Sequence, residues 1–205
     1  MNLENYSYVN LPSKTGNLII DIKNLLISNN KAEIFNHAES VAKTNINIAR
    51  KYNLDENICE LSGYLHDISC IIKPADMLAY AVGNNLYIDE AERKYPFLLH
   101  QRISKLISEK YFDINNLKIL SAVECHTTLK EKPSSYDMAL FIADKLSWDQ
   151  SETPPFYNLL SDALEVSLQK ASLEYMDYMI DKGLLFFPHK WFNEGRKYLH
   201  NNLKD

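Results

Sequence analysis

The sequence predicts an all-helical fold built as a single domain. Glycine occurs only 5 times in 205 residues, and the alternating Val/Ile runs that are typical of strands are missing. Apolar residues instead recur at spacings of three and four, which is the period of one helix face. The length fits one domain, because single hydrophobic cores usually stop growing at about 250 residues. We therefore expect one domain over residues 1–205, with its motifs at about 31–150 and C-terminal helices at 155–205.

Four helices are expected in the N-terminal part of the chain. The first covers about 16–28 and the second about 31–51, each with one apolar stripe. Asp55 can accept from the free amides of the first turn of a third helix, which we expect to carry the His66-Asp67 pair. Pro74 suits the first position of a short helix toward Val82, because the missing N–H of proline is not needed there.

Further helices are expected in the second half of the chain, separated by loops. Lys130–Ser134 and Asp149–Pro155 are predicted as loops because they combine proline with serine or other polar residues. The predicted helices lie at about 96–110, 115–125, 135–148, 155–181 and 190–199.

Composition excludes several classes of function. The net charge of −5 argues against broad nucleic-acid binding, which requires a basic surface. No apolar stretch approaches the ~20 residues of a membrane span, and the N-terminus lacks the pattern of a signal peptide. The 3 cysteines have no CxxC spacing, so neither a disulfide framework nor a thiolate zinc site is indicated. We therefore expect a cytoplasmic protein that binds neither nucleic acid nor membrane.

The strongest local signal is the run Leu65-His66-Asp67-Ile68. It places an imidazole beside a carboxylate in apolar surroundings, where charged groups are rarely found without compensation. Three more histidines, His37, His100 and His126, lie near helix ends or on apolar stripes, and Asp144 lies in the apolar run 139–146. A metal ion is the compensation that this set of ligand types suggests.

Each of these residues also has an ordinary structural interpretation. A single histidine on an apolar face is more often a hydrogen-bonded core residue than a ligand, and Asp144 could pair with the neighbouring Lys145. The order His, His-Asp, His, His, Asp along the chain is what favours a metal site. His189 and His200 fall outside this order, and we interpret both as surface or C-terminal residues.

The same order resembles the HD superfamily of metal-dependent phosphohydrolases, and more closely its bacterial diadenosine tetraphosphate hydrolase branch (the YqeK type). The similarity runs from about Phe35 to Gln150. It rests on Phe35-Asn36-His37, Gly63-Tyr64-Leu65-His66-Asp67-Ile68, Leu98-Leu99-His100, His126-Thr127-Thr128 and Phe141-Ile142-Ala143-Asp144. The resemblance implies an HD-type helical bundle with two metal ions, His37, His66, Asp67 and Asp144 at one and Asp67, His100 and His126 at the other.

The resemblance also implies the chemistry. Two ions about 3.5–4 Å apart can activate water and stabilise an in-line displacement at phosphorus. We therefore expect a hydrolase that cleaves diadenosine tetraphosphate into two ADP, with a di-iron centre for which manganese or cobalt could substitute. Asp67 and His66 would act at the metal centre. Thr127, Lys130, Lys132 and Lys145 are the local candidate donors for the phosphate charge, with Thr127 and Lys145 preferred, because Lys130 and Lys132 are at least as readily interpreted as solvated surface residues.

Departures from the family pattern leave alternatives open. Ile34, Cys70 and Gln150 stand where relatives usually have basic or other polar residues. A nucleotidase acting on mono- or diphosphates is one alternative, a nucleotide-binding HD protein without turnover is a second, and a di-iron oxygenase is a third. Among the aromatic residues that could stack on a base, Trp148 is the preferred candidate. The region after Pro155 is expected to contribute to the substrate pocket or to the contact of a homodimer.

Overall fold

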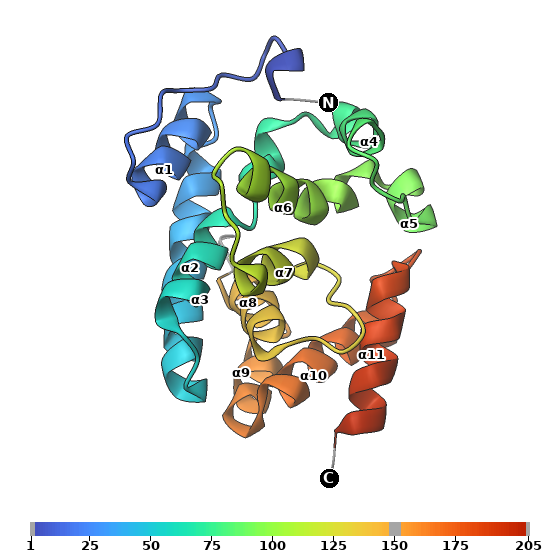
Figure 1. The fold of residues 1–205 in the computed structure, drawn as a ribbon. Coiled ribbons are helices and arrows are strands. Elements are labelled where there is room, and N and C mark those ends of the chain that lie inside the picture. Colours follow the sequence, from blue (N-terminus) through green and yellow to red (C-terminus); the bar gives the residue numbers. More distant parts are fainter. Residues whose placement is uncertain (1–2, 148–152, 204–205) are drawn as a thin grey trace.

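A computed structural model describes residues 3–147 and 153–203 of the chain. Helices follow one another throughout these two ranges. These ranges contain no strand, so the predicted all-helical class is confirmed. Figure 1 shows the arrangement. The α-helices are α1 (Leu18–Ser28), α2 (Ala32–Tyr52), α3 (Glu56–Leu65), α4 (Pro74–Gly83), α5 (Glu90–Lys94), α6 (His100–Lys110), α7 (Leu117–Cys125), α8 (Ser135–Leu146), α9 (Tyr157–Val166), α10 (Leu168–Asp181) and α11 (Lys190–Asn202).

Local polar residues fix where several helices begin. The Asp55 side chain accepts from the backbone amides of Asn57 and Ile58, which confirms its predicted capping of α3. Pro74 is at the start of α4, as expected. Ser134 forms a capping box with Asp137 at the start of α8. Residues 130–134 lie outside any helix, as predicted.

The helices pack around one connected apolar core. In α8 the run Met138–Ala143 is buried throughout, so this helix lies at the centre, with α2, α7 and α10 packed against it. α3 packs along α2, and the two backbones meet at Gly63: a side-chain carbon there would lie 2.5 Å from the Ala42 Cα atom. Figure 1 shows α1, α2 and α3 side by side, with α4, α5 and α11 on the other side of the molecule and α6 between these two groups.

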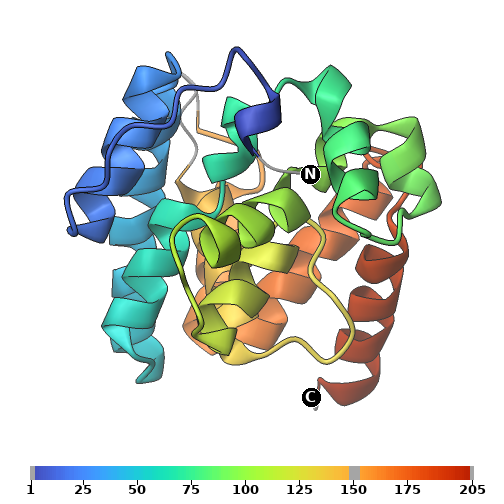
Figure 2. The same cartoon turned by 45° about the horizontal axis from the view of Figure 1, so that its top comes forward.

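The described residues contain three short 3₁₀-helices, of which η2 directly follows Asp67 and η3 directly precedes His100. They are η1 (Leu3–Asn5), η2 (Ile68–Ile71) and η3 (Pro96–Leu99). The N-terminal segment that contains η1 runs along the upper edge of the molecule in Figure 2, and its Leu3 lines a pocket together with Ile107 of α6. None of the helices in the described ranges is long and apolar enough to cross a bilayer.

Four predictions about the elements were wrong in detail. The third helix ends at Leu65, so the His66-Asp67 pair follows it instead of lying within it. The region 96–110 divides into η3 and α6 at His100. The region 155–181 divides into α9 and α10 because Ser167 adopts an extended backbone and caps α10. α5 was not expected, since its five residues are too few to show a period.

Candidate metal centre

Six candidate ligands from five parts of the chain meet inside the bundle. His37 comes from the second turn of α2 and Asp144 from α8, while His66 and Asp67 follow the end of α3. His100 is the first residue of α6, and His126 directly follows α7. Because helix ends and one central helix supply these side chains, their positions are set by the packing of the core.

The first group gathers around Asp144. Its Oδ1 atom is 3.2 Å from His37 Nε2 and 3.6 Å from His66 Nε2. His66 Nε2 is also 3.6 Å from Asp67 Oδ2. One ligand atom from each of His37, His66 and Asp67 lies within 4.8 Å of the others, close enough to share one cation.

The second group gathers around the other oxygen of Asp67. Oδ1 is 3.6 Å from His100 Nε2 and 3.5 Å from His126 Nε2. The two histidine Nε2 atoms are 3.1 Å apart. Asp67 therefore belongs to both groups, with a different carboxylate oxygen directed to each.

Three of the histidines are held in one tautomer by the backbone. In each, Nδ1 lies within hydrogen-bond distance of the carbonyl three residues earlier: 2.7 Å for His66 and Gly63, 2.7 Å for His100 and Phe97, and 2.9 Å for His126 and Val123. A carbonyl can only accept, so the proton sits on Nδ1 and the Nε2 lone pair points into the centre. Histidines that bind a metal commonly donate their other ring nitrogen to a backbone carbonyl in this way.

The donor set fits a divalent cation. His100 Nε2 and His126 Nε2 direct lone pairs at each other across 3.1 Å, an arrangement that a shared cation stabilises. His66 Nε2 and Asp67 Oδ1 are buried and have no hydrogen-bond partner within the described residues. Such atoms are costly in a folded protein unless a ligand satisfies them. Imidazole and carboxylate without thiolate suit iron, manganese or cobalt.

The charges at the centre also suit metal binding. Burial is the main cause that lowers the pKa of His126 to about 4; Asp67 raises this pKa, whereas His66 and His100 lower it, and the imidazole is neutral at pH 7. Burial alone would raise the pKa of Asp67, but His66, His126 and His100 bring it below its usual range. Asp144 behaves in the same way, with Lys145 and His37 outweighing its burial. The carboxylates are therefore anionic, which is the form that binds metal.

Two further predicted site residues contact the ligands. The Lys145 ammonium donates to the His126 carbonyl at 2.7 Å and to Asp144 Oδ2 at 2.9 Å, and its side chain is buried. The Thr127 hydroxyl lies 3.0 Å from His100 Nε2 and is partly exposed. Lys145 thus holds ligands in place, whereas Thr127 is accessible from solvent.

The other predicted residues are placed elsewhere or lie outside the described chain. Lys130 donates to Ser121 at 2.7 Å, and Lys132 is exposed. Trp148 and Gln150 fall outside the described residues. The interpretation of His189 as a surface residue was wrong: it is buried and caps α11, because the chain folds back onto α5. His200 is exposed on α11, as expected.

Two functional neighbours of the ligands were not foreseen. Buried Gln101 accepts from the backbone amides of Thr127 and Thr128 at 3.0 and 3.2 Å, which ties α6 to the segment after α7. Phe97 stacks on the ring of His100. No periodicity distinguishes either residue, and their position next to a candidate ligand in the sequence is the only signal that could have indicated them.

The centre is accessible from one side. The side chains of Asp67 and Asp144 are 18% and 22% exposed, whereas His66 and His126 are buried. A hollow of about 310 Å³ is lined among others by Lys31, Cys70 and Lys73, but by none of the six candidate ligands. The two carboxylates are therefore the part of the centre that is open to solvent.

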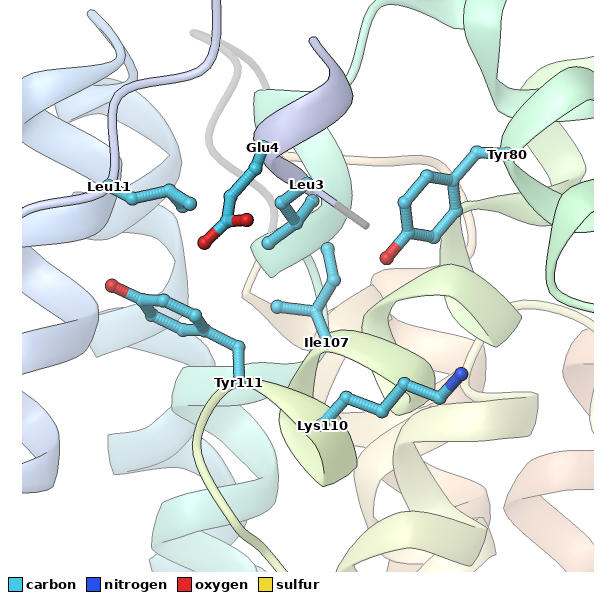
Figure 3. A pocket seen from close by; sticks show the side chains of 7 residues that line it. All are labelled: Leu3, Glu4, Leu11, Tyr80, Ile107, Lys110 and Tyr111. Atoms are coloured by element: carbon cyan, nitrogen blue, oxygen red, sulfur yellow. The ribbon is translucent and has the colours of Figure 1, made fainter. Parts of the chain in front are cut away.

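Another pocket of about 210 Å³ lies apart from these ligands. Figure 3 shows it beneath the N-terminal segment, with Leu3, Ile107 and Tyr80 around it and the Glu4 carboxylate directed toward Leu11 and Tyr111. It contains none of the six candidate ligands. We therefore attribute the chemistry of the molecule to the histidine and aspartate cluster.

Comparison with known proteins agrees with this architecture. The sequence profile for the HD domain matches residues 34–149. An uncharacterised protein from the pepC 5' region of Lactococcus lactis subsp. cremoris is 39% identical over 143 residues, which cover 70% of this chain and 73% of that protein. The symmetrical bis(5'-nucleosyl)-tetraphosphatase of Staphylococcus aureus is 29% identical over 157 residues, covering 75% of this chain and 76% of the enzyme.

A solved structure shows the same fold. The crystal structure of a predicted HD superfamily hydrolase involved in NAD metabolism from Clostridium acetobutylicum has a TM-score of 0.81 against this chain. The match covers 90% of this chain and 97% of the Clostridium acetobutylicum chain, at 24% sequence identity. At that identity the likeness supports the fold, and the chemistry must be argued from the residues of this chain.

Proposed function

The chain belongs to the HD domain family, and we propose that within it this protein is a metal-dependent phosphohydrolase that cleaves diadenosine tetraphosphate into two ADP. The observation that carries the proposal is the position of Asp67, whose two carboxylate oxygens face two separate groups of imidazoles. One cation would be held by His37, His66, Asp67 and Asp144, and another by Asp67, His100 and His126. Iron is the metal that we expect in both, with manganese or cobalt able to replace it.

When bound, such a pair of cations activates water and neutralises the oxygens of a phosphate during in-line displacement. In the reaction, a water oxygen bonds to one central phosphorus and the central P–O anhydride bond breaks. One ADP departs with the electron pair of that bond, and the other keeps the water oxygen. The attacking water gives up its protons to solvent.

The residues of this chain would hold the cations and orient the phosphate. Asp67 and Asp144 remain anionic, so they supply the negative charge that a pair of cations requires. The Thr127 hydroxyl lies 3.0 Å from His100 Nε2 and is partly exposed, so it can donate to a phosphate oxygen. Lys145 acts as a positioning residue, since its ammonium is already occupied by His126 and Asp144.

Relatives support the choice of substrate. The Staphylococcus aureus protein that covers most of this chain is named for symmetrical cleavage of bis(5'-nucleosyl)-tetraphosphates. A Mycoplasma genitalium protein named as a probable nicotinate-nucleotide adenylyltransferase/Ap4A hydrolase is 27% identical over 142 residues, which are 68% of this chain and 39% of that protein. Dinucleoside tetraphosphate is the substrate class that these names have in common.

The test compares products and metal content in matched variants. Wild-type protein loaded with Fe(II) or Mn(II) is incubated with diadenosine tetraphosphate, and we expect ADP as the only nucleotide product. Asp67→Asn should lower the rate by at least about 100-fold and lower the metal content, because the shared ligand loses its charge. Asp113→Asn is the control, since Asp113 is exposed and pairs only with Lys14 on the surface.

The outcomes separate the alternatives. ATP and AMP as products would contradict symmetrical cleavage. Turnover of mono- or diphosphates without turnover of the dinucleotide would indicate a nucleotidase. Binding of nucleotide that is unchanged by Asp67→Asn, with no product after long incubation, would indicate a binding protein without turnover.

A further inference from the structure

Phe97 covers one face of a candidate metal ligand. Its ring is stacked on the imidazole of His100, with centroids 4.6 Å apart and planes at 17°. The residue is nevertheless 50% exposed. A large aromatic side chain beside a polar centre therefore retains accessible surface.

The backbone fixes this placement. Phe97 belongs to η3, whose Pro96 restricts the chain entering it and whose Leu99 is fully buried. The Phe97 carbonyl accepts from His100 Nδ1 at 2.7 Å, so the ring and the imidazole are tied together through the main chain as well as by stacking. Rigid aromatic surfaces cost little entropy when they bind a flat ligand.

We propose that Phe97 is a base-stacking residue of the substrate site: it receives a nucleobase of the nucleotide whose phosphates lie at the metal centre. This inference rests on the proposed function, because it assumes that a nucleotide phosphate occupies the centre. The stacking on His100 places the ring beside the second group of ligands, and the Thr127 hydroxyl lies 3.0 Å from Nε2 of the same histidine.

The other described aromatic candidates are committed to the core or to other contacts. Tyr64 is buried and stacks on Phe35, and both Tyr80 and Phe156 are buried. Tyr136 accepts from the Asp55 amide and has Lys118 over its ring. Phe97 combines an accessible ring with direct contact to a candidate ligand.

Stacking on phenylalanine has a consequence for the substrate class. Every base presents a flat π-face, so stacking discriminates little between bases, unlike hydrogen bonding to base edges. Diguanosine and diadenosine tetraphosphate should therefore be accepted with similar KM values, and a dinucleotide should bind more tightly than its phosphates alone.

The experiment separates the base from the phosphates. Binding to manganese-loaded protein is measured by calorimetry for two ligands that cannot be hydrolysed: the methylene-bridged analogue of ADP, and methylenediphosphonate, which has the same phosphorus groups but no nucleoside. Phe97→Leu should lower the affinity for the ADP analogue by roughly 5- to 30-fold, within the range that loss of a stacked base gives. Methylenediphosphonate binding should change by less than about 2-fold, and Phe97→Trp should retain or strengthen the binding of the analogue.

The control and the opposing outcomes are equally specific. Phe186→Leu removes an aromatic ring that is 88% exposed and should leave both ligands unaffected. Equal weakening of both ligands by Phe97→Leu, or loss of manganese, would show that Phe97 acts only by holding His100, and would overturn the proposal. An unchanged affinity for the analogue would overturn it as well.

Failure of this inference is distinguishable from failure of the proposed function. If wild-type protein cleaves the dinucleotide and Phe97→Leu leaves the affinity for the ADP analogue unchanged, only the stacking role is contradicted. Wild-type protein that binds the ADP analogue through Phe97 but releases no ADP from the dinucleotide removes the proposed activity and keeps the stacking role.

Discussion

At the scale of single residues, Lys145 links two candidate ligands that come from different helices. Its ammonium contacts the carbonyl of His126 and the carboxylate of Asp144, and the side chain lies over the ring of Phe141. A buried cation in this position fixes Asp144 for the metal and offsets its negative charge. Its effect on catalysis is thus expected to pass through the ligands.

Replacing Lys145 tests this positioning role. In Lys145→Met the aliphatic stem is retained and the ammonium is lost, so Asp144 is no longer held by its neighbour. We expect the affinity for manganese to fall by about 10- to 100-fold, as for other groups that orient metal ligands. Metal titration of the purified variant measures this, with exposed Lys132→Met as the control. An unchanged metal affinity with a raised KM would instead indicate direct contact with phosphate.

The buried His126 makes the metal-free protein sensitive to acid. Its pKa is about 4 in the folded protein and near 6.5 when unfolded, so below pH 6.5 the unfolded chain binds the extra proton. Stability therefore falls as the pH drops from 6.5 toward 4, and it rises again as the pH is raised. Because the pKa values of Asp67 and Asp144 are lowered in the folded protein, these two residues add a further loss of stability only below about pH 4, where the carboxylates of the unfolded chain become protonated.

The expected size of this effect is about 2 kcal/mol between pH 7 and pH 5. It is measured by urea unfolding in the presence of chelator. His126→Gln should reduce the difference, because the group that charges on unfolding is removed. His200→Gln should not, since that histidine is exposed on α11 and pairs with Asp177. An equal pH dependence in wild type and His126→Gln would contradict this account.

The candidate ligands could be predicted from the sequence, whereas several residues around them could not. The six ligand candidates were identified because imidazoles and carboxylates in apolar runs are unusual and because their order matches a known pattern. The structure brings all six together, while their roles remain proposals. His189 and Gln101 could not be interpreted correctly, because their burial depends on contacts with α5 and with the segment after α7 that no local pattern encodes.

At the scale of elements, the approach of α2 and α3 decides whether the first ligand group forms. α2 carries His37, and His66 follows α3. The helices meet where Gly63 faces Ala42. The Gly63 carbonyl also accepts from His66 Nδ1 at 2.7 Å. One glycine thus permits the close contact and fixes the tautomer of the neighbouring ligand.

Gly63→Ala should separate these helices. The added carbon would lie 2.5 Å from the Ala42 Cα, and the backbone there cannot give way as a flexible side chain would. We expect a loss of about 1–3 kcal/mol in the free energy of unfolding, typical of overpacking, together with weaker metal binding. Thermal unfolding and metal titration measure the two effects. Gly83→Ala, at the exposed end of α4, should change neither.

Element boundaries were predictable where a capping residue is distinctive. Asp55 and Pro74 indicated the starts of α3 and α4 correctly. Ser167 is as good a cap as these, but it lies inside a long apolar period that continues on both sides, so α9 and α10 were predicted as one helix. α5 depends on its capping box at Asp89 and on tertiary contacts, which outweigh its shortness.

At the scale of the whole molecule, the C-terminal helix is joined to the motif region by a buried ionic cluster. Arg102 of α6 donates to Glu92 of α5 at 2.9 and 3.1 Å, and Glu92 also lies 3.5 Å from His189 at the start of α11. The guanidinium lies over the ring of Trp191. Burial would raise the pKa of Glu92, but His189, the Asp89 amide and Arg102 lower it, so the carboxylate stays charged.

Removing one member of this cluster should therefore cost more than removing a surface ion pair. Arg102→Met leaves Glu92 fully buried without its guanidinium partner, and we expect a loss of about 3–5 kcal/mol in the free energy of unfolding. Arg50→Met, which breaks an exposed pair with Glu56, should cost no more than about 1 kcal/mol.

A second variant shows whether the loss comes from the unpaired charge. Arg102→Met combined with Glu92→Met removes both charges and should recover part of the stability, because two apolar side chains can fill the same space without an uncompensated ion. Hydrogen exchange should then show α11 opening more easily in Arg102→Met than in the double variant, since His189 and Trp191 connect α11 to this cluster. If Arg102→Met costs no more than Arg50→Met, α11 must be held by its apolar contacts with α10, and the ionic cluster contributes little to closing the molecule.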